Sequence, residues 1–163
     1  MDITKYHSIS RQINAEIERF NALLAKFKFS MLDASSPGSC LVVANNPWKS
    51  LNLGLCPSGD CPGVYVLCAC QKDNPTSLAA YVGKASGQNI SREVGQKLGS
   101  SPQRAEGIYT MSGRSGQTFI IEVVVAVGVR EAPMRFLASA LEEFIIDGVQ
   151  GRINLLNGTG VER

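Results

Sequence analysis

Apolar residues in the N-terminal part of the chain recur at helical spacing. Over residues 9–27 they return every three or four positions, while Arg11 and Glu16 lie on other faces. This pattern predicts one long amphipathic helix. Residues 33–60 follow it and are rich in Ser, Pro, Gly and Asn. They predict an irregular segment that contains one short strand at most.

Three later segments have the apolar patterns of β-strands. The nearly unbroken apolar run 64–70 is typical of a strand that is covered on both faces, and residues 78–82 are typical of a second one. The seven residues between them, 71–77, are too few for a parallel crossover, so the two runs are predicted to form an antiparallel hairpin. Residues 118–127, with their dense β-branched side chains, predict a third strand.

Two further helices are predicted from spacing and from start signals. Ile90, Val94 and Leu98 lie four residues apart, which marks a short helix after the hairpin. Pro133 suits the first turn of another helix, which is predicted to end near residue 147.

The stretch between these helices is polar, contains Arg104 and Arg114, and predicts a surface loop. The order of elements predicts an α+β fold in which a three-stranded antiparallel sheet is flanked by helices. Residues 1–60 would form an N-terminal extension of helix and irregular chain, and residues 61–163 the main domain. A chain of 163 residues matches one domain of typical size.

Charge and hydropathy narrow the possible functions only a little. The net charge of +2 neither requires nor excludes a nucleic-acid partner, so a phosphate-binding surface would have to come from local clusters of Lys and Arg. The sequence has no apolar stretch of the length that a membrane span needs, and its N-terminus is polar. We therefore expect no membrane partner and a cytoplasmic location.

Five cysteines also favour a reducing compartment, because an odd number leaves at least one thiol unpaired. A zinc knuckle that uses Cys40, Cys56 and Cys61 is one alternative, although paired C-x-x-C spacing is absent. Buried or loop cysteines with free thiols fit the spacing better, since free Cys is among the most buried residue types.

The predicted hairpin carries two short motifs. Pro62-Gly63-Val64-Tyr65 opens its first strand, and Tyr81-Val82-Gly83-Lys84-Ala85 closes its second, with the two tyrosines sixteen residues apart. The pair resembles the two half-motifs of the GIY-YIG nucleases, and it is most similar to the nuclease domain of the bacterial nucleotide-excision-repair incision subunit. Gly107-Ile108-Tyr109 matches the first tripeptide literally. No second half-motif follows it and it falls in the predicted polar loop, so we treat it as a chance match.

Further residues match the family in the same order along the chain. The family has an Arg on the helix after the second half-motif, and Arg92 lies eleven residues after Tyr81. The segment Leu141-Glu142 with Ile145 is similar to the one that carries the family's metal-binding Glu. Arg152-Ile153-Asn154 then places an Asn twelve residues after Glu142, as in the family.

Two positions depart from the family pattern. Gln96 stands where many members have His or Tyr, four residues after the Arg. The helix also contains one extra residue, so an alignment at Asn89 would put Glu93 at the Arg position. We choose Arg92 because an anionic side chain could not stabilise the transition state of phosphodiester hydrolysis.

The resemblance implies that the hairpin supplies the groups that act on water and phosphate. Tyr65 would act as general base or position the water, although a free Tyr has a pKa of about 10 and would need a nearby cation, such as Lys84, to ionise near neutral pH. Tyr81 would hydrogen-bond the scissile phosphate or the water. The alternative for both tyrosines is a purely structural role, as aromatic side chains packed in the core.

The remaining site residues implied by the resemblance lie on the helices and near the C-terminus. Arg92 would clamp the non-bridging oxygens of the phosphate. Glu142 would be the single protein ligand of Mg²⁺ or Mn²⁺, which keeps several waters. Helical periodicity does not choose between Glu142 and Glu143, and the family register selects Glu142. Asn154 would support the site by hydrogen bonds.

These expectations describe a divalent-metal-dependent DNA endonuclease, and its size suggests a free-standing restriction-type enzyme. Cutting both strands would call for a homodimer. Lys97, Arg104 and Arg114 are the candidate DNA contacts, because they lie outside the apolar stripes. The alternatives are a structure-specific or mobile-element nuclease, a catalytically silent nucleic-acid-binding module of the same fold, and a cysteine-based metal or redox protein.

Overall fold

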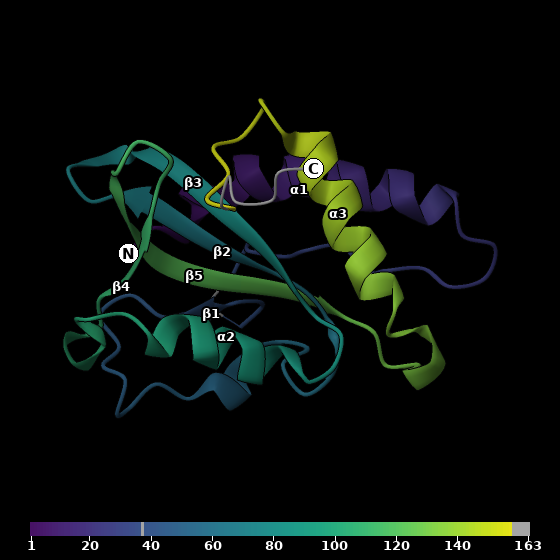
Figure 1. Cartoon of the computed structure of the whole chain (residues 1–163), viewed down its shortest axis with the longest axis horizontal. Helices are drawn as coiled ribbons and strands as arrows, with labels where there is room; N and C mark the ends of the chain where they lie inside the picture. Colours follow the sequence, from purple (N-terminus) through teal and green to yellow (C-terminus); the bar gives the residue numbers. More distant parts are fainter. Residues whose placement is uncertain (37, 158–163) are drawn as a thin grey trace.

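One antiparallel sheet of five strands forms the centre of the molecule (Figure 1). The structure, a computed structural model, describes residues 1–36 and 38–157. The strands lie in the order β1-β5-β2-β3, and β4 pairs with the early part of β5. Their bounds are β1 (Leu41–Val42), β2 (Gly63–Gln71), β3 (Asn74–Ala85), β4 (Tyr109–Ser112) and β5 (Thr118–Gly128).

The α+β class is confirmed, but the prediction of three strands is wrong. Both additional strands are too short to show an alternating pattern in the sequence. β1 has two residues, in the segment where one short strand was allowed, and β4 has four residues in the predicted polar loop. Tyr109 opens β4 and is buried. The expectation that the tripeptide Gly107-Ile108-Tyr109 lies in a polar loop is therefore also wrong.

The antiparallel hairpin is confirmed as the pair β2 and β3. Tyr65 lies opposite Gly83, and Leu67 lies opposite Tyr81. β2 is hydrogen-bonded to β3 on one edge and to β5 on the other, and both of its faces are covered. This position explains why its sequence is apolar without interruption.

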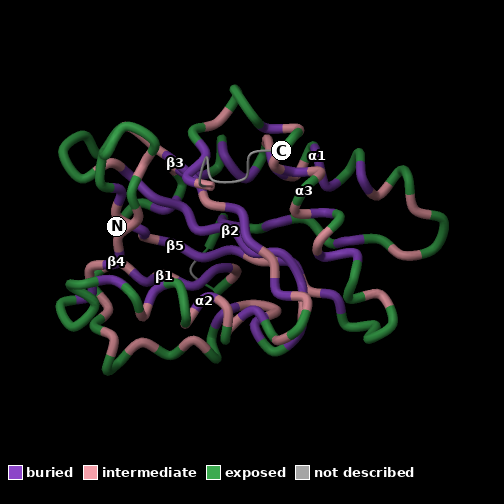
Figure 2. Tube along the Cα trace, viewed as in Figure 1, coloured by how far each residue is buried: buried purple, intermediate pink, exposed green. Residues whose placement is uncertain are grey.

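Helices cover both faces of the sheet. A 3₁₀ turn (Ile3–Tyr6) leads into α1 (His7–Ala22), which packs with α3 (Leu137–Val149) against one face, while α2 (Ile90–Gly99) covers the other (Figure 1). Figure 2 shows that the central strands are buried along most of their length. Shorter 3₁₀ turns are found at Leu53–Leu55, Arg104–Glu106 and Ala132–Met134.

Alternate residues of β2 supply two separate hydrophobic cores, one on each face of the sheet. The core under α1 and α3 contains Val64, Val66 and Cys68. The core under α2 contains Tyr65, Leu67 and Ala69.

The N-terminal helix is shorter than predicted and ends at Ala22 instead of residue 27. The apolar pattern continues because Phe27 and Phe29 fold back, and the Phe29 ring lies 6.0 Å from that of Phe20. Asn21 holds this return by bonding the backbone N–H and C=O of Phe29 at 2.8 and 2.9 Å.

Residues 1–60 share the sheet and the core of the main domain. β1 pairs with β5, and the residues of α1 and α3 belong to one hydrophobic cluster. None of the helices within the described residues is long and apolar enough to cross a membrane.

Candidate active site

Tyr65 and Tyr81 lie together on the α2 face of the sheet. They come from neighbouring strands, and both belong to the core on that face. Their ring centroids are 6.3 Å apart, a separation at which aromatic rings attract each other. Tyr65 is 1% exposed, whereas Tyr81 is partly exposed. The two tyrosines of the half-motifs therefore meet on one face of the sheet.

The glycines of the two half-motifs are required by space. A Cβ atom on Gly83 would lie 2.5 Å from the hydroxyl oxygen of Tyr65, so a side chain there would displace the phenol. A Cβ atom on Gly63 would overlap the carbonyl oxygen of Val127 on β5 and crowd Ile90 of α2. Gly83 therefore makes room for Tyr65 to reach across β3, and Gly63 allows the close approach of β5 and α2.

Lys84 and Glu142 form an ion pair at the other face of the same hairpin. Lys84 pairs with Val64 in the strand register, and its Nζ lies 3.2 Å from Oε2 of Glu142 on α3. The side chain of Glu142 is 15% exposed, whereas Glu143 is exposed. The structure thus places Glu142, and not Glu143, against the hairpin.

The capping of α2 fixes which of its polar residues face the tyrosines. Asn89 caps the helix by accepting a hydrogen bond from the backbone N–H of Arg92 at 2.9 Å, and Ile90 and Val94 are buried against the sheet. Residues two positions apart point in nearly opposite directions on a helix. Arg92, two positions from both buried residues, is therefore on the outward face, and it is exposed.

Glu93 and Lys97 lie on the side of α2 that Arg92 was expected to occupy. The Nζ of Lys97 is 4.6 Å from the centroid of the Tyr81 ring. Glu93 is half-buried, accepts a hydrogen bond of 2.6 Å from Nε2 of Gln88, and acts by its charge on Tyr65. The position of Arg92 therefore does not support its predicted role, and the alignment that was set aside matches the helix orientation.

Burial and negative charge keep Tyr65 protonated. Its pKa is raised above the ordinary value of 10.0, first by burial and then by the charges of Tyr81, Glu93 and Glu142. Lys84, which was expected to favour the phenolate, is instead paired with Glu142. In this structure Tyr65 is a neutral hydrogen-bond donor at neutral pH.

Asn154 is not brought to the tyrosines by its side chain. It is exposed, and its carbonyl oxygen accepts a hydrogen bond from the N–H of Ala80. Asn157 instead binds the edge of β3: its Oδ1 accepts from the N–H of Val82 at 2.9 Å, and its Nδ2 donates to the C=O of Val82 at 2.6 Å. The segment after α3 is thereby fixed beside Tyr81.

The other two candidate DNA contacts lie outside α2, and Arg114 lies away from Tyr65. Arg104 is in the 3₁₀ turn after α2, and Arg114 is in the loop between β4 and β5; both are exposed. The β4–β5 loop lies at the Gln71 end of β2, since Gln71 pairs with Phe119. Gln71 lies six positions along the strand from Tyr65, which corresponds to roughly 20 Å.

The donor set for a metal ion is small. No group of three His, Cys, Asp or Glu side chains that could hold a metal is present in residues 1–36 and 38–157. Glu142 offers one partly buried carboxylate, which fits a hard cation that keeps most of its waters. An ion bound there would have to compete with Lys84 for the carboxylate.

The cysteines behave as buried thiols. Cys40, Cys56 and Cys61 each donate to a local carbonyl oxygen, of Ser36, Pro57 and Ser58 respectively. Burial raises the pKa of Cys56 to about 11. A thiolate, which zinc binding or redox chemistry would need, is therefore disfavoured at Cys56.

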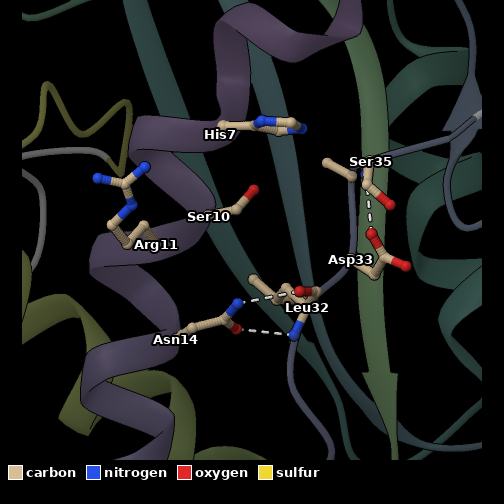
Figure 3. A pocket seen from close by; sticks show the side chains of 8 residues that line it. His7, Ser10, Arg11, Asn14, Leu32, Asp33 and Ser35 are labelled. Atoms are coloured by element: carbon tan, nitrogen blue, oxygen red, sulfur yellow. Dashed lines mark hydrogen bonds between the residues drawn. The ribbon is translucent and has the colours of Figure 1, made fainter.

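A depression of about 300 Å³ lies between α1 and the segment that returns along it (Figure 3). His7, Ser10 and Asp33 line it, which are the residue types of a hydrolytic triad. Ser10, however, donates to the carbonyl oxygen of Tyr6, and the Asp33 carboxylate accepts from Ser35. Asn14 likewise bonds the backbone of Leu32. These contacts fix the segment to the helix and leave Ser10 without a base.

Comparisons with protein-family models, with curated protein sequences and with solved structures found no match. The resemblance to the GIY-YIG nucleases therefore depends on the residues quoted above, and a function has to be argued from the geometry of the tyrosine pair and its neighbours.

Sequence reasoning named Lys97 only as a general DNA contact, set Glu93 aside, and missed Asn157. Glu93 and Lys97 could have been assigned from the spacing of the buried residues of α2, since that spacing already places Arg92 on the opposite face. Asn157 carried no signal, because a side chain that binds backbone groups of a distant strand leaves no periodic pattern.

Proposed function

We propose that this protein is a divalent-metal-dependent endonuclease that hydrolyses phosphodiester bonds in DNA. The observation that carries the proposal is the convergence on one hairpin of Tyr65, Tyr81 and the Lys84–Glu142 pair. The charge of Glu142 on α3 acts on the buried phenol of Tyr65. Glu142 thus connects the two faces of the hairpin, because it pairs with Lys84 on one face and acts by its charge on Tyr65, which lies beside Tyr81 on the other.

Tyr65 and Tyr81 would hold the phosphate and the attacking water. The raised pKa of Tyr65 favours a role as hydrogen-bond donor in the ligand-free protein. Removal of its proton would require added positive charge nearby, because positive charge stabilises the phenolate. Tyr81, which is partly exposed, would be the first of the two to contact a substrate.

Glu142 would hold Mg²⁺ or Mn²⁺. When bound, such an ion supplies positive charge to the phosphate and lowers the pKa of a coordinated water. Lys84 compensates the Glu142 carboxylate in the ligand-free protein, and its ammonium group would be free to contact phosphate once Glu142 binds a cation. Arg92 and the side chain of Asn154 have no part in this proposal.

Plasmid cleavage with added Mg²⁺ or Mn²⁺ tests the proposal. Glu142→Gln keeps the size of the side chain but removes the charge that a hard cation needs, so cleavage should be lost while the protein stays folded. Glu143→Gln, at the exposed neighbouring position, is the matched control and should cleave normally. Tyr65→Phe should also abolish cleavage, because it removes the hydroxyl that is proposed to act on the phosphate or the water and leaves the ring in place. Full cleavage by Glu142→Gln or Tyr65→Phe would contradict the mechanism.

A catalytically silent nucleic-acid-binding module is the second candidate. It is favoured by Glu93, an acidic residue beside Tyr65 where a nuclease needs a cation. Such a module would bind DNA with an affinity that falls as salt rises, and it would not nick plasmid with either metal. Wild-type protein that binds DNA but leaves it intact would support this reading.

Restriction-type cutting of both strands stays a prediction that requires a homodimer on the DNA. Light scattering of the protein with and without a DNA duplex measures the number of copies bound. A structure-specific or mobile-element nuclease could act as a monomer and would prefer branched or nicked substrates over plain duplex.

A further inference from the structure

The site needs a cation that neither Arg92 nor Lys84 supplies in the ligand-free protein. The buried phenol of Tyr65 is surrounded by the negative charges of Glu93 and Glu142, and a phosphodiester would bring a further negative charge. Lys84 is engaged by Glu142, and Arg92 is on the outward face of α2. A phosphate that approaches the tyrosines before a metal ion binds would meet these charges, unless another positive group offset them.

Lys97 is such a group. Its Nζ lies over the ring of Tyr81, 4.6 Å from the centroid, one helical turn after Glu93 on the same side of α2. The side chain is exposed, so its ammonium group is open to a ligand. Contacts between a cation and an aromatic face are weak at exposed sites, whereas a hydrogen bond to a charged phosphate oxygen is among the strongest a Lys makes. The ammonium group can therefore leave the ring for a phosphate.

We propose that Lys97 is the phosphate-binding cation of the tyrosine site and contacts the non-bridging oxygens of the scissile phosphodiester beside Tyr81. This inference rests on the proposed function and assigns to Lys97 the role that the sequence resemblance implied for Arg92. Glu93 accepts a hydrogen bond from the amide of Gln88. Its negative charge would repel an anionic ligand unless Lys97 neutralises that ligand.

Lys97→Met and Arg92→Met form a matched pair on one helix. Each removes one positive charge and keeps a long apolar side chain, so overall charge and helix propensity change alike. In plasmid cleavage at saturating DNA, Lys97→Met should lower the rate about a hundredfold, as expected for loss of one group that stabilises the transition state. Arg92→Met should stay within about threefold of wild type, and Lys97→Arg should recover most of the rate. Equal losses in the two Met variants would overturn the assignment.

A binding measurement tests the inference even if the protein does not cleave DNA. The ring signals of Tyr81 are followed by NMR while a short DNA duplex is added in EDTA. In wild type and Arg92→Met these signals should shift, and in Lys97→Met the shift should be lost, because the ammonium group no longer brings phosphate to the ring. Absence of any Tyr81 shift in wild-type protein overturns the role of Lys97, whereas a shift without cleavage overturns only the proposed endonuclease.

Discussion

The two faces of the sheet use the same strands in different ways. On the α1/α3 face, buried charges are matched by opposite charges: Glu16 binds Arg19 and Arg152, and Glu122 binds Lys5 and Tyr6. Buried phenols on both faces have a raised pKa, but Tyr6 on the α1/α3 face donates a hydrogen bond of 2.6 Å to Glu122, whereas Tyr65 on the α2 face lies beside a second phenol, that of Tyr81.

Alternate residues of one strand therefore serve two purposes, packing on one face and the candidate site on the other. Val64 and Val66 of β2 pack beneath α1 and α3, and Tyr65 between them reaches the candidate site. Glu16 and Glu122, whose carboxylates are bound by side chains of other elements, hold those elements together. A group kept neutral against nearby anions has a protonation state that a bound cation can change. Function is therefore expected on the α2 face and at the end of the hairpin.

The largest effect on stability is expected at Glu16. Its side chain is 2% exposed and lies against α3, where a Cβ atom on Gly148 would overlap its carboxylate. Glu16→Ala removes the bonds to Arg19 and Arg152 and leaves a cavity, so we expect a loss of about 3 kcal/mol in the free energy of unfolding. Urea denaturation measures it.

The control for Glu16 is Glu18→Ala on the exposed face of α1. That change should stay within about 0.5 kcal/mol of wild type. Similar losses for both variants would show that Glu16 does not anchor α1 to α3. The view that paired charges stabilise this face would then be wrong.

Gly83→Ala should affect both stability and activity. The new methyl group would force the ring of Tyr65 from its position, which we expect to cost about 2 kcal/mol, as overpacking in a core does. Because the displaced phenol no longer faces its partners, cleavage should fall together with stability. Gly87→Ala, at a position with no atom within 4 Å of the new Cβ, should change neither. Plasmid cleavage and thermal melts of the two variants decide this.

The central elements could be predicted from sequence because each shows its own periodicity. The hairpin, the last strand and the helix at Ile90 were found where the pattern placed them. The end of α1 was not, because Phe27 and Phe29 continue the apolar pattern while the chain folds back on Phe20. Periodicity reports burial, and it cannot distinguish one more helical turn from a return of the chain.

The candidate site was predicted only in part for a related reason. Tyr65, Tyr81 and Glu142 lie on elements whose burial pattern the sequence shows. Arg92 was chosen for its charge, although the spacing of Ile90 and Val94 puts it on the outward face. The chemistry of phosphate binding requires a cationic side chain, but the orientation of the helix determines which cationic residue faces the tyrosines.

Asn157→Ala tests how the C-terminal segment supports the α2 face. The variant loses both hydrogen bonds to Val82, each worth about 1 kcal/mol. We expect a global loss of about 1 kcal/mol, less than the sum of the two bonds, because the segment can open locally without unfolding of the whole chain. For the same reason, hydrogen exchange at the amide of Val82 should be faster. Asn154→Ala is the matched control, since the described contact of Asn154 with β3 uses its backbone carbonyl. Equal exchange rates in the two variants would mean that the Asn157 side chain does not hold the segment.

A small effect is also expected at Glu122, and it should depend on pH. Glu122 lies at a bulge of β5, between Ile121 and Val123, which pair with adjacent residues of β2. Burial alone would raise its pKa, but hydrogen bonds from Lys5 and Tyr6 outweigh burial and lower it below the ordinary value of 4.5. A lowered pKa in the folded state means that the unfolded chain binds the proton more readily. The contribution of Glu122 to stability is therefore present above about pH 4.5 and is lost as the pH falls through the lower, folded value.

Glu122→Gln should therefore reduce the free energy of unfolding by about 1 kcal/mol at neutral pH, and its difference from wild type should shrink at about pH 3. Urea midpoints over this range measure the difference, with Glu18→Gln as the exposed control. A difference that stays constant from neutral to acid pH would show that Glu122 acts through shape rather than charge, and the contrast between a charge-paired face and a reactive one would then rest on Glu16 alone.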